Sequence, residues 1–543
     1  MSNTHRNPTD TEINAVIKFY TSGQIEEARA VLIRLTRKYP NEALLYNFLG
    51  VCYATLNQTE AAFGSFESAL RINPDNAEVH YNLGNTLKAC DRLNASIKSY
   101  TRALEINPFH ADTHINLGNA FKGIGNIEKA VSHYEHAIQI NPSYTEAHCN
   151  LGNTLHVIGN LEAAISCYQQ ALSIDPSDAE AHNCLGNTYN DLGKTDAALS
   201  AIEQALTIKP TNPQFWASYA TALHQKKFKT FNESFSNYLV KALQQPTINP
   251  NYIAPAIVSA LQQHPKIKLA IKASKNDLIE KNLPFFSDQL ASISLFLALL
   301  ENCPIADPEI EYLLTQMRRA ALNQLFDSIL NGIDFSFYYS LALHCFTNEY
   351  IFFETDEEIQ NVTKLENKIN YQVNNNLPIP PIWIVLLAAY RPLHNYLWAE
   401  QLQKTALPVN SHKILARQLF DIKKEQHLKT KIHQLTSIND STPNAVKEQY
   451  EQNPYPRWIN PGLFHNPKTI RENLHAINPQ LSIDDNHYSK MPNILIAGCG
   501  TGQHALNSQS RFLNCTVLAI DLSLNSLSYA MRKTHELSIT NIN

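Results

Sequence analysis

The sequence predicts a mainly α-helical protein with three parts: a right-handed α-solenoid of helical hairpins, an all-helical middle region, and the first β-α-β-α portion of an α/β domain. Three observations support this prediction. Helical apolar spacing continues through the middle of the chain, and a buried-strand pattern followed by "GCGTG" begins at residue 493. In the first half, glycines recur at an interval of 34 residues, at Gly50, Gly84, Gly118, Gly152 and Gly186.

Length and charge limit the classes of protein that fit. A chain of 543 residues is too long for one hydrophobic core, so we expect several domains. The net charge is only −5 and no basic stripe is present, so we expect no nucleic-acid partner. The N-terminus lacks the apolar core of a signal peptide, and the longest apolar run, 382–390, is about half a membrane span. We therefore expect a cytoplasmic protein without a membrane partner, with its nine cysteines as free thiols.

The 34-residue interval extends to other positions of the first half. A Gly or Ala where two helices cross lets their backbones approach, and a large side chain one turn later fills the groove beside it. A proline near the end of each copy stops the helix, at Pro40, Pro74, Pro108, Pro142, Pro176 and Pro210. A period of 34 is that of tetratricopeptide repeats, so we expect six of them over 9–212, after a tail at 1–8. A degenerate seventh repeat or cap is expected over 213–246.

Two columns of polar residues have the same interval. The first consists of His80, His114, His148 and His182. Equivalent residues in stacked hairpins lie about a helix diameter apart, too far to share one zinc ion, so we expect a packing position and no metal. The second column consists of Asn82, Asn116 and Asn150, each three residues before Asn85, Asn119 and Asn153, with Asn187 continuing the latter row.

Residues three apart share a helix face, and a ladder of amides can pair with the backbone of an extended peptide without reading its sequence. The "NLGN" wording of these repeats resembles that of the O-GlcNAc transferase superhelix, whose asparagine ladder holds substrate peptides. The resemblance implies a protein or peptide partner in the groove. Asparagine is also common at both positions in ordinary tetratricopeptide repeats, so a purely structural role stays open.

The middle of the chain gives fewer signals. We expect a helical domain over 247–440 and a connecting segment over 441–490. The acidic run from Glu354 to Glu358 is expected to be a solvated helix end. In "YEQNPYPRW" the two prolines forbid a regular helix, so Tyr455 and Trp458 should project from an extended arm. That arm is either a linker clamped to the next domain or a lid over its active site.

The glycine-rich stretch at 498–502 lies between a predicted strand and a predicted helix, and a second strand ends at Asp521. This order is the opening half of a Rossmann-like domain, with Asp521 able to accept both hydroxyls of a ribose. The spacing Gly498, Gly500, Gly502 differs from the dinucleotide form, in which the third glycine comes one place later. The pattern resembles motif I of class I S-adenosylmethionine-dependent methyltransferases. The resemblance implies that the three glycines contact the amino-acid end of S-adenosyl-L-methionine and that Asp521 binds its ribose.

One departure concerns Ile496, which occupies the position where many members of that family carry an acid. The whole layout resembles a bacterial family of tetratricopeptide-repeat proteins with a C-terminal methyltransferase domain, here truncated, since 491–543 holds an incomplete domain. We expect no third strand, adenine contact or catalytic residue in it, and poor binding or none of the cofactor.

Two functions from different classes are consistent with these patterns. The first is an S-adenosylmethionine-dependent methyltransferase whose solenoid recruits the substrate. The alternative is a non-catalytic scaffold for protein-protein interaction. A glycosyltransferase, based on "NLGN" alone, is disfavoured because no stretch gives the strand pattern of a sugar-nucleotide domain. The resemblance supplies neither the methyl acceptor nor the catalytic residues.

Overall fold

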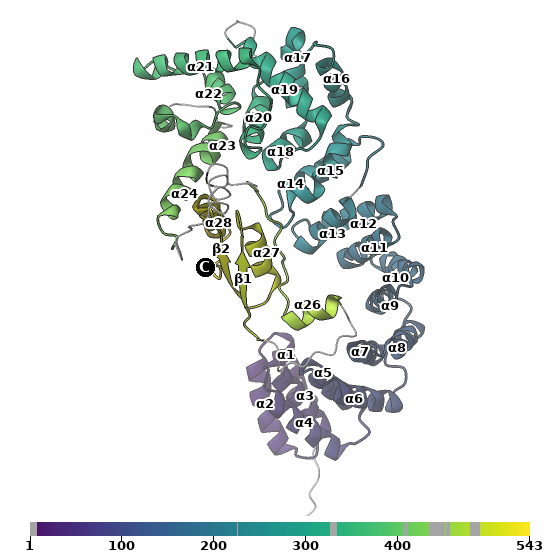
Figure 1. Ribbon diagram of the computed structural model, residues 1–543. Helices are drawn as coiled ribbons and strands as arrows, with labels where there is room; N and C mark the ends of the chain where they lie inside the picture. The colour runs from purple at the N-terminus through teal and green to yellow at the C-terminus, as the bar shows by residue number, and fades with distance from the viewer. Residues whose placement is uncertain are drawn as a thin grey trace, which may run out of the picture. The chain divides into compact units, whose positions relative to one another are not determined.

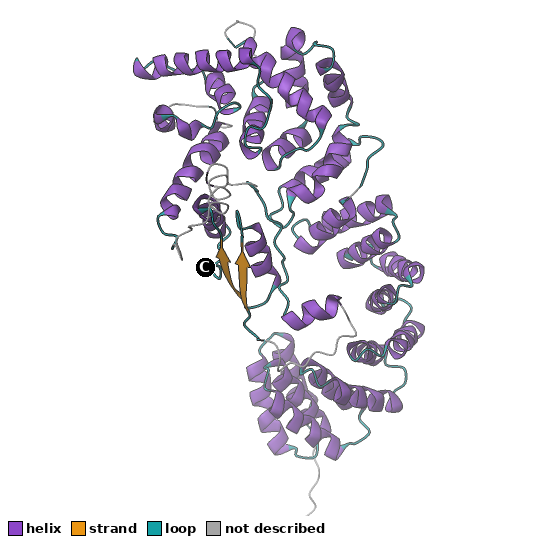
Figure 2. Ribbon diagram, in the orientation of Figure 1, coloured by secondary structure: helices purple, strands orange, loops and turns teal. Residues whose placement is uncertain are grey.

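The computed structural model describes residues 8–224, 226–325, 334–404, 408, 411–433, 451, 457–477 and 489–543. The chain divides into two compact units, Met1–Pro210 and Thr211–Asn543. Helices form nearly all of the described secondary structure, and two strands lie near the C-terminal end (Figure 2).

The first unit is a stack of six helical hairpins (Figure 1). Its helices are α1 (Asp10–Thr21), α2 (Ile25–Lys38), α3 (Ala43–Thr55), α4 (Thr59–Ile72), α5 (Ala77–Ala89), α6 (Leu93–Ile106), α7 (Ala111–Gly123), α8 (Ile127–Ile140), α9 (Thr145–Val157), α10 (Leu161–Ile174), α11 (Ala179–Asp191) and α12 (Thr195–Ile208).

The recurring glycines lie where a large side chain of the second helix meets the first helix. A Cβ added to Gly84 would lie 2.5 Å from Cε1 of Tyr100, and one added to Gly50 would lie 2.5 Å from Cε1 of Phe66. Both rings are fully buried. The prediction placed these glycines where helices approach closely, and the structure shows that the space is taken by a ring packed directly on the helix backbone.

The second unit begins with more helices. They are α13 (Pro213–Leu223), α14 (Glu233–Leu243), α15 (Pro250–Leu261), α16 (Pro265–Ser274), η1 (Glu280–Asn282), α17 (Leu283–Ala291), α18 (Ser294–Asn302), α19 (Pro308–Asn323), α20 (Ser336–Thr347), α21 (Asp356–Asn374), α22 (Pro381–Ala388), η3 (Leu393–Asn395), η4 (Leu397–Lys404), α23 (Ser411–Leu415), η5 (Ala416–Phe420), α24 (Asp421–Lys429) and α26 (Ile470–Ile477). No single helix in the described ranges is long and apolar enough to cross a membrane, although the bent pair Glu280–Ala291 and Ser294–Asn302 meets that test jointly.

The acidic run before and within α21 is less exposed to solvent than expected. Glu358 is fully buried, accepts hydrogen bonds from Tyr390 and Arg319, and closes a capping box with Thr355. Glu354 pairs with Arg391 through two hydrogen bonds of 2.6 and 2.9 Å. The expectation of a solvated helix end was therefore wrong for these two carboxylates, because cations distant in sequence lie against them.

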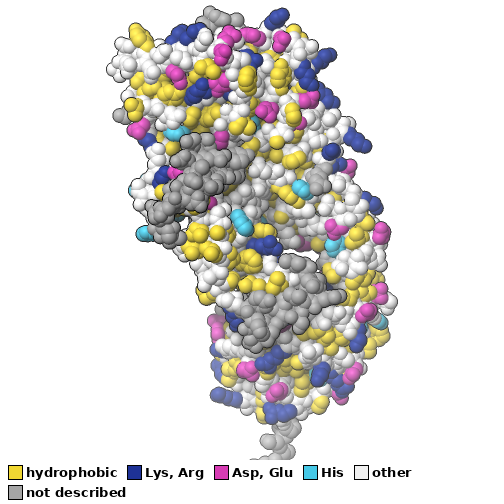
Figure 3. All heavy atoms as spheres, viewed as in Figure 1, with side chains coloured by type: hydrophobic (Ala, Val, Ile, Leu, Met, Phe, Trp, Pro, Cys, Tyr) yellow, Lys and Arg dark blue, Asp and Glu magenta, His cyan; other side chains and the backbone are white. Residues whose placement is uncertain are grey.

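The C-terminal part has the predicted order of elements: β1 (Asn493–Ala497), α27 (Gln503–Arg511), β2 (Thr516–Ile520) and α28 (Leu524–Glu536). The two strands are parallel, with Asn493 opposite Thr516. One face of the sheet is exposed, with Leu495 at 63% and Leu518 at 48% of full exposure, and Figure 3 shows apolar side chains gathered in this region. The continuous apolar run of β1 thus belongs to a strand that is packed on one face within the described residues.

The last residues pair with the other edge of β2. Ile542 forms a parallel bridge with Val517, and Asn543 donates its N–H to the carbonyl of Val517 at 2.9 Å. Ala519 in turn donates to the carbonyl of Asn543 at 2.9 Å. These residues form an isolated bridge outside the two strands of the sheet, whose order within the described residues is β1–β2.

Candidate functional sites: an asparagine column and a glycine loop

The asparagines that come one residue after the repeated glycines are held by tyrosines of the second helices. Three tyrosine hydroxyls donate to the side-chain oxygens of these asparagines, Tyr100 to Asn85 at 2.8 Å, Tyr134 to Asn119 at 2.7 Å, and Tyr168 to Asn153 at 2.8 Å. With Oδ1 occupied, the Nδ2 group of each amide keeps its two donors for other partners.

This pairing was missed from the sequence, although a signal for it was present. Each tyrosine comes 15 residues after its asparagine, and Phe66, which has no hydroxyl, comes 15 residues after Val51. Asn187 has the aliphatic Ile202 at that spacing, so it lacks this hydrogen bond. In these repeats each tyrosine at this spacing has an asparagine partner, because a hydroxyl buried against an apolar side chain is costly.

The other row of asparagines links neighbouring first helices. Asn82 donates to Asn47 at 3.1 Å, and Asn116 donates to Asn85 at 3.3 Å. The ammonium of Lys88 donates to Oδ1 of Asn116 at 2.6 Å, and burial lowers the pKa of Lys88. In the part of the chain that the structure describes, the side-chain amides of Asn150 and Asn187 have no hydrogen-bond partner. The column is thus partly a structural network and partly a set of open amides.

The histidine column ties each first helix to the turn before it. Every Nε2 lies within hydrogen-bond distance of the carbonyl of the proline six residues earlier, at 3.0 Å for His80, 3.1 Å for His114, 2.9 Å for His148 and 3.1 Å for His182. The imidazole is therefore a structural donor at a packing position. Among the described residues, no group of three or more His, Cys, Asp or Glu side chains is arranged to hold a metal ion.

The three glycines of the loop after β1 all have backbone conformations that side chains disfavour. Their φ angles are +70° for Gly498, +52° for Gly500 and +84° for Gly502. A Cβ on Gly498 or Gly500 would meet nothing within 4 Å, whereas a Cβ on Gly502 would lie 2.5 Å from the Cβ of Ala530. The first two glycines thus leave open space over the loop, and the third allows close approach to α28.

Asp521 at the end of β2 is brought to this loop. Its Oδ2 accepts the N–H of Gly500 at 2.7 Å, and its Oδ1 accepts the N–H of Ser523 at 2.9 Å. Ser523 caps α28 by accepting from the backbone N–H of Ser526. The structure therefore places all four residues singled out from this motif around one loop. Ile496 is buried among apolar neighbours, including Cys499 and Val517.

The arm before the α/β part is docked onto the loop at Trp458. The Nε1 of Trp458 donates to the carbonyl of Thr501 at 3.1 Å, and the hydroxyl of Tyr529 donates to the carbonyl of Trp458 at 2.5 Å. Trp458 is buried against Leu506 and Tyr529. At this residue the arm is clamped to the α/β part, while the predicted projection of Tyr455 lies outside the described residues.

A stack of hairpins with a 34-residue period, glycine-to-ring packing and a proline in each turn defines the first unit as a tetratricopeptide solenoid, a class of protein-interaction scaffold. Two family models described as tetratricopeptide repeat match residues 14–77, and residues 77–110 and 179–212. A third, described as TPR repeat, matches residues 124–159 and 156–193.

Solved structures similar to this chain include two that are described as TPR proteins. A thermophilic TPR protein from Thermus thermophilus is 26% identical, with a TM-score of 0.28, and the match covers 34% of this chain and 99% of that one. YrrB, described as a TPR protein with an unusual peptide-binding site, is 22% identical, with a TM-score of 0.31, and the match covers 36% of this chain and 96% of that one. PilF of Pseudomonas aeruginosa is 18% identical, with a TM-score of 0.36, and the match covers 40% of this chain and 97% of that one. No curated protein matches this chain.

Proposed function

We propose that this protein is an S-adenosylmethionine-dependent methyltransferase whose solenoid recruits a protein substrate. The observation that carries the proposal is the convergence of Gly498, Gly500, Gly502 and Asp521 on one loop between a parallel strand and a helix. The space that side chains at Gly498 and Gly500 would fill is open, as a ligand lying against the loop backbone requires. The residues present therefore fit the cofactor.

In this proposal each residue has a definite task. The loop glycines let the backbone approach the methionine end of the cofactor, and the carboxylate of Asp521 accepts the ribose hydroxyls through lone pairs that its two backbone donors leave unused. The cofactor supplies the activated methyl group when it is bound. The protein contributes position and the exclusion of water. The methyl acceptor and the catalytic residues stay unassigned.

The solenoid supplies the substrate side of the proposal. The Nδ2 groups of Asn85, Asn119 and Asn153 are oriented by the tyrosines that occupy the Oδ1 atoms. A column of N–H donors at repeat spacing suits the carbonyl groups of an extended peptide. We therefore assign a segment of a partner protein to the face that carries these asparagines.

A non-catalytic scaffold is the second candidate, and one observation favours it. The N–H of Gly500 and the carboxylate of Asp521, both of which a nucleotide would use, already satisfy each other at 2.7 Å. A loop that is closed in this way needs no ligand to be stable.

Photo-crosslinking of the full chain to methyl-tritiated S-adenosylmethionine separates the two candidates, because it traps the weak binding that we expect. The methyltransferase proposal predicts labelling that unlabelled cofactor competes away and that Asp521→Asn reduces about tenfold. Asp277→Asn is the matched control, since Asp277 has a φ of +53° that asparagine also adopts, and it should be labelled as strongly as the wild type. Equal labelling of the wild type and Asp521→Asn would contradict the proposed cofactor site, and the non-catalytic scaffold would be the remaining candidate.

A further inference from the structure

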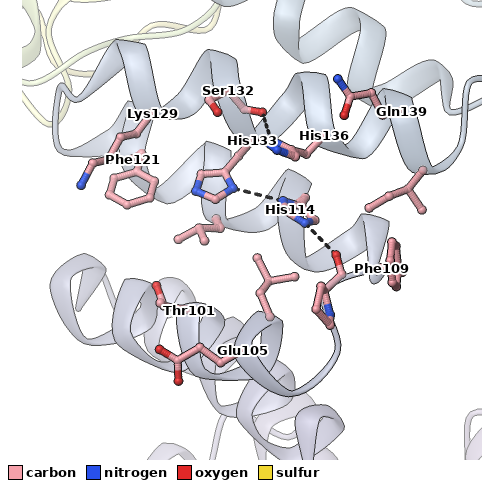
Figure 4. Close-up of a pocket in the computed structure, with 14 residues that line it drawn as sticks. Thr101, Glu105, Phe109, His114, Phe121, Lys129, Ser132, His133, His136 and Gln139 are labelled. Atoms are coloured by element: carbon pink, nitrogen blue, oxygen red, sulfur yellow. Dashed lines mark hydrogen bonds between the residues drawn. The ribbon is translucent and has the colours of Figure 1, made fainter.

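A cavity with a volume of about 1100 Å³ lies within the first unit. Helices α6 and α8 form its sides and α7 contributes its floor (Figure 4). At about 100° per residue, His114, Leu117 and Phe121 of α7 lie on the face opposite to Asn116 and Asn119. The cavity is therefore separate from the asparagine column.

The repeats provide an internal comparison that marks this cavity as unusual. Position 129 is lysine, whereas the second, third, fifth and sixth repeats have Ala61, Ala95, Ala163 and Ala197. Position 133 is histidine, whereas the same repeats have Ser65, Ser99, Cys167 and Ala201. Phe109 is 78% exposed, whereas its equivalents are Asn41, Asp75, Ser143 and Ser177. Since small or polar residues suffice for the fold at these positions in four other copies, packing alone does not explain the departures.

Hydrogen bonds fix the tautomers of the three histidines around the cavity, which face one another in Figure 4. The Nε2 of His114 donates to the carbonyl of Pro108 at 3.1 Å, so its Nδ1 carries a lone pair in the neutral ring. The Nδ1 of His133, 3.1 Å away, must then donate, which leaves Nε2 of His133 as an acceptor. His136 donates from Nδ1 to the carbonyl of Ser132 at 2.6 Å, which leaves its Nε2 as an acceptor as well.

Burial keeps part of this cluster neutral. Desolvation, helped by the neighbouring histidines and Lys129, lowers the pKa of His133 to about 4, and desolvation also lowers the pKa of His114. The other ionisable groups around these two rings are Glu105 on α6, His110 before α7 and His136 on α8. At neutral pH the cavity therefore offers the lone pair on Nε2 of His133.

The other side chains that line the cavity limit which ligands can bind. Leu104, Leu117 and Ile140 are apolar and suit a ring. The ammonium of Lys129, 5.1 Å from the centre of the Phe121 ring, disfavours a cation, and the carboxylate of Glu105 disfavours an anion. We propose that this cavity binds a tyrosine or tryptophan side chain of a partner protein, whose O–H or N–H donates to Nε2 of His133.

Saturation-transfer NMR on the full chain at pH 7.5 tests the proposal, because the method detects weak ligands of large proteins. The probes are N-acetyltyrosinamide and N-acetylphenylalaninamide, which differ by the hydroxyl alone. We expect the tyrosine probe to bind about 3–10 times more tightly, which corresponds to one hydrogen bond. His133→Ser should remove this preference and still fold, since Ser65 and Ser99 occupy the same position. Cys167→Ser, the equivalent position of the next repeat, should keep it.

Three outcomes would overturn the inference. The wild type binding both probes equally would remove the donor requirement. If folded His133→Ser still bound the tyrosine probe more tightly than the phenylalanine probe, His133 would not be the acceptor. If N-acetylphenylalanine, which has a free carboxylate, bound more tightly than N-acetyltyrosinamide, the cavity would be an anion site instead. None of these results bears on the loop after β1, so this inference fails or holds independently of the proposed methyl transfer.

Discussion

In the repeats, Gly84 lies in a regular helix and its missing Cβ leaves room for the ring of Tyr100, whereas Gly498 in the loop after β1 has a φ of +70° and faces open space. The same residue type thus meets a packing requirement in the first unit and a conformational requirement in the second. The difference teaches that a repeated glycine within a helix is evidence for contact between elements, while a glycine with positive φ that faces open space is evidence for a backbone turn that side chains disfavour.

The largest effect is expected from a substitution that fills the space left for the ring of Tyr100. Gly84→Ala places a methyl group 2.5 Å from a buried ring and should lower the free energy of unfolding of the first unit by about 2–3 kcal/mol. Far-ultraviolet circular dichroism during urea denaturation of the full chain measures this change. Gly64→Ala, where an added Cβ meets nothing within 4 Å, is the control and should not destabilise the unit. A loss below about 1 kcal/mol for Gly84→Ala would contradict the packing role.

A smaller effect concerns the histidine cluster and pH. The folded state holds the pKa of His133 at about 4, below the ordinary 6.5, so the unfolded chain binds more protons between these values. Stability is therefore present above pH 6.5 and is lost as the pH falls toward 4. We expect a loss on the order of 1–2 kcal/mol by pH 5, and a smaller loss in His133→Ser. Melting temperatures of both proteins at pH 7.5 and pH 5 measure the difference, and equal shifts would contradict it.

Substitution of a glycine that is needed for its positive φ should cost less stability than Gly84→Ala. Gly498→Ala introduces no collision but forces a side chain into the left-handed region, so it should cost the second unit about 1 kcal/mol. All four tryptophans belong to the second unit, so their fluorescence during denaturation reports on it. Gly502→Ala adds a collision with Ala530 and should cost more. If the two variants were equally stable, the distinct roles assigned to these glycines would be wrong.

The tyrosine-asparagine pairs give an effect of similar size within the repeats. Tyr134→Phe removes one hydrogen bond of 2.7 Å to Asn119 and should cost about 1 kcal/mol. The reverse substitution, Phe66→Tyr, would bring a hydroxyl toward Val51 and should also destabilise the unit, which serves as the matched test of pairing. Thermal unfolding of both variants measures these changes. An unchanged melting temperature for Tyr134→Phe would show that the hydroxyl has no structural role.

Features that repeat, or that belong to a motif of fixed spacing, could be predicted from the sequence. The helix-crossing glycines and the convergence of Asp521 with the glycine loop are of this kind, because spacing alone determines them. The burial of Glu358 and the docking of Trp458 on Thr501 could not be predicted, since their partners are distant in sequence. The bond between Gly500 and Asp521 was also not visible, although both residues were singled out.

The smallest effects on stability are expected in the asparagine column. Two substitutions there distinguish asparagines with a structural role from asparagines proposed to bind a substrate. Asn116 bonds to Asn85 and Lys88, so Asn116→Ala should cost about 1 kcal/mol, whereas Asn150→Ala removes no side-chain hydrogen bond in the described chain and should change stability by less than about 0.5 kcal/mol. Both variants should nevertheless weaken capture of an extended peptide, because each removes an amide from the same face. Thermal unfolding combined with binding of the native acceptor measures the two properties separately. If Asn150→Ala bound the acceptor as tightly as the wild type, the column would be structural alone and recruitment would have to depend on another surface of the solenoid, of which the cavity around His133 is the first to test.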